Sequence, residues 1–322
     1  MTVFRRKRVA VVAAVAAFVA ALAALGALSR ATTTVPAPAV AVQPATGSTV
    51  PFASWYWTMA VSPADPNVLV LGTSSGLDRS SDGGKTWKPT GPAGINATSL
   101  VTIGNVIFMG GARGESKAGP VIRTGAVRSV ADGAAVVEAS TDGGQTWRVL
   151  HPSGLPNIAV QALASDPANS TALYALLNNG KLYRSTDDAS SFQIVSSKLG
   201  IPPWAFAITQ GNHFVGGDMD IGPHVSTNGL TWQQTAYTDA RGGHMVMEYA
   251  VQPTDTTRVL MTSIGIETST DSGTTWHTAL KSTVMYGPVA WAPSKPDLAY
   301  AVGFDGSVWH SADSGTSWTK VR

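Results

Sequence analysis

The sequence has no cysteine among its 322 residues. Disulfide bonds, thiolate metal sites and cysteine nucleophiles are therefore excluded. Charged residues make up only 13% of the chain, and the formal net charge of +2 lacks the basic excess of a nucleic-acid-binding protein. Beyond the N-terminus the chain also lacks the Ala/Glu/Lys/Leu patterning of a helical bundle. It contains instead 33 Gly, 19 Pro and 10 Trp, which indicate many tight turns and many short, half-buried strands.

Acidic residues are absent before Asp65, and this absence sets the N-terminal segment apart. Four basic residues, Arg5-Arg6-Lys7-Arg8, directly precede an uncharged apolar run over residues 9–28. The 20 residues of this run exceed the ~7–15 of a signal-peptide core and reach the ~20 of a membrane span, which places the run at the border between a cleaved signal and an uncleaved anchor. We therefore predict one N-terminal hydrophobic helix within residues 1–28, as a signal peptide or signal anchor. A Pro/Ala/Thr-rich linker is predicted over residues 29–50.

The same segment predicts where the rest of the chain resides. A positive cluster before an apolar run keeps the N-terminus in the cytoplasm and directs the following chain outward. We expect an extracytoplasmic protein, either secreted or anchored in the membrane through residues 9–28. The part after residue 30 carries 17 basic and 20 acidic residues. This mildly acidic balance argues against nucleic acid as a partner.

An internal repeat is the strongest signal in the sequence. Six segments match the template Ser-x-Asp-x-Gly-x-Thr-Trp, and a period of about 40–50 residues is typical of repeat architectures. Successive Asp positions are separated by 60, 45, 41, 43 and 42 residues. Ser and Asp side chains close tight turns, Gly adopts positive φ, and Trp buries a large ring. We assign these structural positions to Asp82, Asp142, Asp187, Asn228, Asp271 and Asp313.

Two boxes depart from the template. The third has Ala189 and Phe192 in place of Gly and Trp, and the fourth has Asn228 in place of Asp and is one residue shorter. Looser turns are expected at both. Before most boxes the chain repeats a Pro/Asp turn followed by a hydrophobic strand, as at residues 253–255 and 259–262. Four short antiparallel strands per repeat are typical of a β-propeller blade.

We therefore predict an all-β fold, a six-bladed β-propeller with Asp-box turns over residues 51–322. A seventh blade without a box, inside the long first interval, is the alternative. The boxes resemble those of the BNR or Asp-box propeller families, which include sialidases, xyloglucan-type endoglucanases, sortilin-like receptors and photosystem II assembly factors. The resemblance covers roughly residues 55–322 and implies the fold. It does not select an activity, because unrelated functions share this motif.

Function is expected on the face opposite the boxes, where the loops differ from blade to blade. We predict a binding or scaffolding module for a protein, peptide or glycan, without a cofactor. An assembly role for a membrane complex is implied only by the resemblance and the tether. The candidate binding residues are aromatic or charged and lie on these loops or near strand starts. They are Tyr56, Trp57, Arg113, Glu115, Lys117, Trp204, Arg241, His244, Tyr286 and Asp305.

The alternative is a glycan-active hydrolase. Such an enzyme needs two carboxyl groups about 5–10 Å apart. Counting from the Pro/Asp turns places Thr58, Gln161, Glu248 and Pro288 at equivalent positions that face the central channel, and only Glu248 among them is charged. Glu248 would pair with Asp218, Asp220 or Asp239. A sialidase is disfavoured because its set of three converging arginines has no counterpart here. No metal site is predicted, because the six His are scattered and the half calcium loop at Asp218–Gly222 lacks a closing Glu.

Overall fold

The computed structural model describes residues 50–51, 53, 55–114, 133–201 and 203–321. The predicted N-terminal helix, nearly all of the predicted linker, and Glu115 and Lys117 lie outside these ranges. Within them the only helical element is a 3-10 turn, η2, at Gln210–Asn212. No helix of the described ranges has the length and apolarity needed to cross a membrane.

Four of the sheets are four-stranded antiparallel meanders in chain order, as in propeller blades. Blade 1 contains β1 (Tyr56–Val61), β2 (Leu69–Thr73), β3 (Gly76–Ser80) and β4 (Lys88–Thr90). Blade 2 contains β5 (Ile95–Ile103), β6 (Val106–Arg113), β7 (Ala135–Ser140) and β8 (Arg148–Val149). Blade 3 contains β9 (Val160–Asp166), β10 (Asn169–Leu177), β11 (Leu182–Ser185) and β12 (Gln193–Ser196). Blade 4 contains β13 (Ala205–Thr209), β14 (His213–Gly217), β15 (His224–Ser226) and β16 (Gln233–Gln234).

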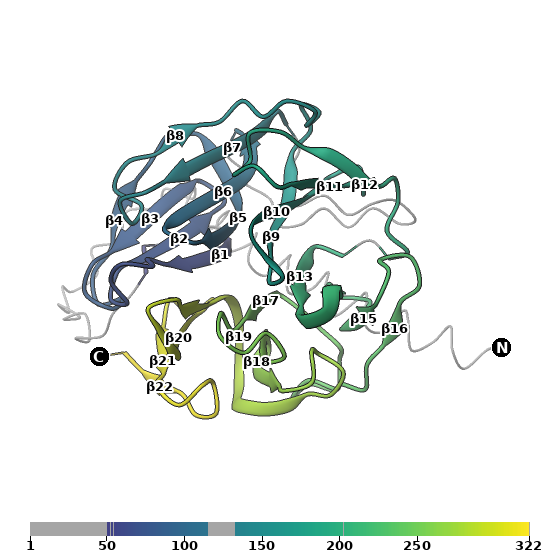
Figure 1. Cartoon of the computed structure of the whole chain (residues 1–322). Coiled ribbons are helices and arrows are strands. Elements are labelled where there is room, and N and C mark those ends of the chain that lie inside the picture. The colour runs from purple at the N-terminus through teal and green to yellow at the C-terminus, as the bar shows by residue number, and fades with distance from the viewer. Residues whose placement is uncertain (1–49, 52, 54, 115–132, 202, 322) are drawn as a thin grey trace, which may run out of the picture. The chain divides into compact units, whose positions relative to one another are not determined.

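The last sheet has six strands, also in chain order. They are β17 (Glu248–Val251), β18 (Val259–Ser269), β19 (His277–Ala292), β20 (Lys295–Gly303), β21 (Val308–Ser311) and β22 (Thr319–Lys320). β19 connects the two halves, because its first part pairs with β18 and its last part with β20. The innermost strands neighbour one another in the cyclic order β1, β5, β9, β13, β17, β19 and β1 again. The chain is thus an all-β propeller with at least four blades (Figure 1).

The Asp-box turns join the third and fourth strands and are closed by short-range hydrogen bonds. In the first box, the backbone N–H groups of Lys85 and Thr86 donate to Asp82 Oδ1 at 3.0 and 2.8 Å. The Thr86 hydroxyl donates to Asp82 Oδ2 at 2.6 Å. Gly84, with φ +87°, donates its N–H to Ser80 Oγ at 2.9 Å. All of these bonds span four residues or fewer, so the turn is specified locally.

The third box forms the same turn without glycine. Ala189 adopts a φ of +63° and still donates its N–H to Ser185 Oγ at 3.0 Å. Asp187 accepts the Ser191 hydroxyl at 2.6 Å. The left-handed conformation costs an alanine roughly 1–2 kcal/mol. Burial of the Ala189 methyl group in the apolar cluster around Phe192 offsets this cost.

The Asp boxes and the Pro/Asp turns lie at the same end of the sheets. Backbone N–H groups of three boxes donate to carbonyl groups of these turns: Gly83 to Asn67 at 2.9 Å, Ser272 to Thr257 at 2.8 Å and Ser314 to Asp297 at 3.0 Å. We call this end the Asp-box face. The opposite end, with the turns between second and third strands, is the loop face.

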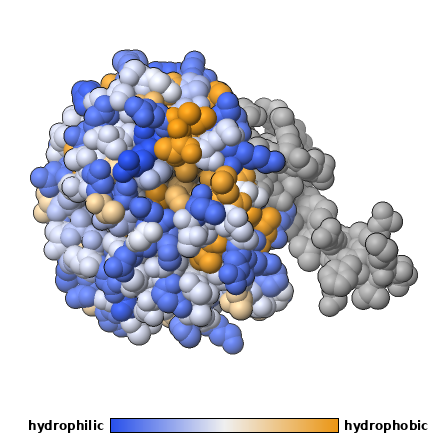
Figure 2. Space-filling model, turned by 45° about the vertical axis from the view of Figure 1, so that its right-hand side comes forward, coloured by the Kyte–Doolittle hydropathy of each residue, from blue (hydrophilic) through white to orange (hydrophobic). Residues whose placement is uncertain are grey.

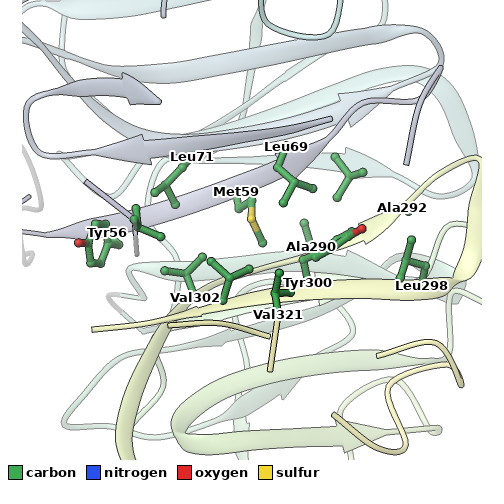
Figure 3. Close-up of a cluster of buried hydrophobic side chains, with 13 residues drawn as sticks. Tyr56, Met59, Leu69, Leu71, Ala290, Ala292, Leu298, Tyr300, Val302 and Val321 are labelled. Carbon is green, nitrogen blue, oxygen red and sulfur yellow. The ribbon is translucent and has the colours of Figure 1, made fainter. Parts of the chain in front are cut away.

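Ring closure between blade 1 and the six-stranded sheet depends on side-chain packing (Figure 3). Met59, Leu69 and Leu71 of blade 1 pack against side chains of β19 and β20 such as Ala290 and Tyr300. In the described ranges no strand pairing joins these two sheets. The final strand, β22, pairs with β21 of its own sheet. Val50 packs in the same cluster, and its N–H donates to the Gly306 carbonyl at 3.2 Å.

The face shown in Figure 2 is mostly hydrophilic, with a band of hydrophobic side chains among hydrophilic ones. The large hydrophobic residues that are exposed within the described ranges are Val149, Ile194, Val195 and Leu230. Two of them are on β12, the outer strand of blade 3.

Candidate functional site: the central cavity

A cavity of about 320 Å³ lies at the centre of the ring. Its walls come from the innermost strands β1, β5, β9, β13 and β17 and from the last part of β19. These are the strands that follow one another around the axis. The cavity is therefore built jointly by all the sheets.

The cavity opens on the Asp-box face. Besides the inner strands, its lining includes the turn residues Gly104, Pro167, Pro253 and Pro293, which belong to that face. Among the described residues, none of the turns between second and third strands contributes to the lining. The accessible face of the channel is thus the one with the repeated turns, and not the one with the variable loops.

At the loop face an aromatic cluster fills the axis. Trp55 and Trp57 are stacked with ring centroids 5.4 Å apart, and Phe304 meets Trp55 edge-on at 5.2 Å. These rings belong to one buried cluster with Trp204 and Met247, which come from blade 4 and from the start of the six-stranded sheet. Because the cluster joins blade 1 to sheets across the ring, it forms the floor of the cavity.

Glu248 is the principal ionisable group at this floor. The Thr58 hydroxyl donates to Glu248 Oε1 at 2.8 Å, and the Val289 backbone N–H donates to Oε2 at 3.1 Å. The Thr58 oxygen in turn accepts the Leu100 N–H at 3.0 Å, which directs its own proton to Glu248. Burial raises the pKa of Glu248 well above its usual range, against the lowering effect of the bonds from Thr58 and Val289. Its side chain keeps partial exposure, which the cavity provides.

Three residues of the cavity lining carry a buried polar atom without a partner within the described part of the chain. These atoms are Trp57 Nε1, a donor, Gln161 Oε1, an acceptor, and the Tyr249 hydroxyl. Only 9% of Trp57 and 4% of Gln161 is exposed. The Gln161 amide is held in place because its Nε2 donates to the Pro203 carbonyl. Each of these atoms is itself buried from solvent, and a buried polar atom left unpaired costs about 1–3 kcal/mol.

The other predicted carboxylates lie outside this cavity. Asp218 Oδ1 accepts the N–H groups of Asp220 and Ile221 at 2.7 and 2.9 Å. Asp239 Oδ1 accepts those of Arg241 and Gly243 at 2.8 and 3.0 Å. Each carboxylate thus closes its own loop. Of the four candidates only Glu248 lines the cavity, and a hydrolytic carboxylate pair stays a prediction.

The predicted binding residues divide into two groups. Trp57 and Trp204 line the cavity, and the Trp204 Nε1–H donates to the Val246 carbonyl at 3.0 Å. The other described ones contribute nothing to that lining, and Glu115 and Lys117 lie outside the described residues. Tyr56 and Tyr286 are buried, Arg113 is exposed at the end of β6, and Arg241, His244 and Asp305 are exposed on loops.

Sequence reasoning missed two features. Gln161 was recognised as equivalent to Thr58 and Glu248, by counting from the Pro/Asp turns, but it was not chosen as a site residue. A buried polar cluster was also missed: the Tyr237 hydroxyl lies 2.5 Å from Ser263 Oγ and 3.5 Å from Glu267 Oε1. Burial raises the pKa of both Tyr237 and Glu267. No local motif connects these residues, which are 26 and 30 positions apart.

No family model matches the chain, and no curated protein matches it. The chain is similar to the solved structure of YCF48 bound to D1 peptide, with 19% identity, a TM-score of 0.48, and coverage of 88% of this chain and 86% of that one. YCF48 from Cyanidioschyzon merolae has 15% identity, a TM-score of 0.45 and 86% coverage of both chains. The Niastella koreensis GH74 enzyme has 17% identity and a TM-score of 0.46, over 82% of this chain but only 46% of the enzyme. Similarities this low do not assign a function to this chain. Its propeller fold is assigned from the arrangement of its own sheets.

Proposed function

We propose that this propeller is a binding module that receives part of a protein or peptide partner in its central cavity, from the Asp-box face. The observation that carries the proposal is Glu248, a carboxyl group that receives hydrogen bonds only from a hydroxyl and a backbone N–H and keeps partial exposure in an open cavity. A propeller that only scaffolds would gain stability from an apolar residue at this position, because removing a carboxyl group from water costs free energy.

The dimensions of the cavity agree with this role. Its volume of about 320 Å³ is at the lower end of the ~300–1,000 Å³ typical of ligand sites. A single side chain or a chain end fits this space, whereas a folded domain does not. The partner would therefore insert one projecting group and rest the remainder on the turns around the mouth.

The absence of cysteine makes a direct test possible, because one introduced thiol can be labelled uniquely. Ser165 lines the cavity near its mouth, and Ser190 is exposed in the third Asp box outside the lining. Ser165→Cys and Ser190→Cys would each be coupled to a bulky maleimide. Peptides selected on the full chain from a random heptapeptide library serve as probes, and their affinity is measured by titration calorimetry.

We expect the label at Ser165 to weaken peptide binding at least about tenfold, or 1.4 kcal/mol. The label at Ser190 should leave binding unchanged. Peptides that bind equally well to both labelled proteins and to the unlabelled chain would contradict a role for the cavity.

Two finer statements belong to the same proposal. We infer six blades, because the six-stranded sheet carries the last two Asp boxes and its strands pair as β17–β18–β19 and β19–β20–β21–β22.

We also propose an extracytoplasmic location with a tether or cleaved signal in residues 1–28, supported by the charge pattern alone. N-terminal sequencing of the mature protein tests the latter.

A further inference from the structure

We infer that the group received by the cavity is a primary ammonium at the end of an aliphatic stem, as on a lysine side chain of the partner. This inference rests on the proposed function and specifies its ligand. It follows from three features of the lining: its charge, its excess of hydrogen-bond acceptors and its apolar upper wall.

The lining is acidic and contains no Lys, Arg or His. Its carboxyl groups are those of Glu248 and Asp166, and Asp166 is already paired with Arg184 at 2.9 Å. Glu248 receives hydrogen bonds only from a hydroxyl and a backbone N–H, neither of which is charged. The cavity therefore contains one carboxyl group whose charge no lining residue balances, and it favours a cation over a neutral or anionic group.

Hydrogen-bond acceptors outnumber donors at the floor. A carboxylate offers about four lone-pair sites, of which Thr58 and Val289 occupy two. The two remaining sites belong to a side chain that is partly exposed in the cavity. An ammonium group has three donors and no acceptor, so it matches this excess better than a hydroxyl or an amide, which would bring acceptors of their own.

Above the polar floor the walls are aliphatic. Val61, Ala164 and Val251 each lie three residues nearer the Pro/Asp turns than Thr58, Gln161 and Glu248 respectively, and all three line the cavity. Ile103 and Ile208 also contribute to the lining. The methylene stem of a lysine buries well along such a wall while its head reaches the polar end.

Binding of a cation at this place is linked to protonation. The ionisable groups of the lining are Glu248, Asp166 and Tyr249, and Asp166 is held by Arg184. Burial favours the protonated form of Glu248 and of Tyr249. An ammonium stabilises the carboxylate of Glu248, so its binding releases a proton and strengthens as pH rises.

The test uses the full chain with N-acetyl-lysine amide and its neutral counterpart N-acetyl-norleucine amide as probes, followed by calorimetry and by the indole N–H resonance of Trp57. We expect the lysine compound to bind at least about tenfold more tightly and to shift this resonance. Glu248→Gln should remove the preference, whereas Asp188→Asn, which neutralises an exposed carboxylate outside the lining, should keep it. N-acetyl-arginine amide distinguishes an ammonium site from a guanidinium site, and its tighter binding would overturn the assignment to ammonium.

A measurement on the unchanged protein covers the case in which Glu248→Gln fails to fold. The affinity of the lysine compound should rise with pH, while that of the norleucine compound should stay constant. Equal binding of both compounds at every pH, each displaced by a label at Ser165→Cys, would overturn the ammonium inference and leave the proposed function intact. Library peptides that ignore the Ser165 label would instead overturn the proposed function itself.

Discussion

The packing between blade 1 and the six-stranded sheet predicts a specific weak point in the ring. Leu69 is fully buried in the cluster that joins these sheets and pairs with Ser80 of the first Asp box (Figure 3). Leu173 is the corresponding residue of blade 3: it is fully buried and pairs with Ser185, but its cluster joins blades 2 and 3. The two leucines therefore differ in which interface they fill.

Leu69→Ala and Leu173→Ala should each lower the free energy of unfolding by about 2–5 kcal/mol, because both remove the same buried carbons and leave a cavity. The local consequence should differ. Blades 2 and 3 are consecutive in the chain, whereas no strand pairing in the described ranges joins blade 1 to the six-stranded sheet. Loss of packing at Leu69 should thus allow the ring to open there without global unfolding.

Native-state hydrogen exchange, followed by mass spectrometry, measures this opening. In Leu69→Ala, amides of β1 to β3 and of β20 to β21 should exchange faster by roughly 30-fold to a few thousandfold, the equivalent of about 2–5 kcal/mol. Strands β9 to β11 should be much less affected. Leu173→Ala should give no selective loss in β1 to β3 and β20 to β21. The same even loss of protection over all sheets in both variants would refute the idea that the packing around Leu69 holds this interface closed.

Three further predictions concern the boxes and the cavity. Hydrogen bonds from Thr146, Ser140 and Gln145 outweigh burial and lower the pKa of Asp142 to about 2. Asp142 should therefore stabilise the fold above pH ~4 and lose that effect as pH falls towards 2. Asp142→Asn should make the melting temperature depend less on pH in this range. The same fall of melting temperature between pH 4 and 2 in the variant and the wild type would contradict this prediction. Glu248 should affect the pH dependence of stability in the opposite direction. Because its pKa is raised in the folded state, the free energy of unfolding should fall as pH rises above the pKa of the unfolded state, and Glu248→Gln should lose less stability between pH 5 and 9. A wild-type profile without this fall would contradict the raised pKa. Gly144 and Gly94 both have positive φ, but only at Gly144 would a Cβ clash with a side chain of blade 1. Gly144→Ala should therefore lower the free energy of unfolding by about 1–3 kcal/mol more than Gly94→Ala does, as measured by denaturant titration.

The sequence was most informative where interactions are local. An Asp box closes through hydrogen bonds between residues at most four positions apart, so its six copies predict six turns of the same kind. Their spacing predicts short antiparallel strands, and the structure confirms a propeller with at least four blades. The expected loosening of the third box is not seen in its hydrogen bonds, because Ala189 adopts the left-handed conformation that Gly would have.

The site depended on contacts that no motif describes. Counting from the Pro/Asp turns predicted that Gln161 and Glu248 face the axis, and both line the cavity. The counting could not show that the cavity opens on the Asp-box face, since that depends on how Trp55, Trp57 and Trp204 pack across the ring.

By itself, the sequence determined the repeat, the turn chemistry and hence the blade, because these follow from bonds within a few residues and from strand periodicity. Only the tertiary structure decided which polar atoms lack a partner and which end of the channel is filled. The bond from Thr58 to Glu248 joins residues 190 positions apart, and the unpaired atoms of Trp57 and Gln161 reflect the absence of a partner in every sheet around them. Such properties belong to the closed ring, since the inner strands of all the sheets contribute to the cavity.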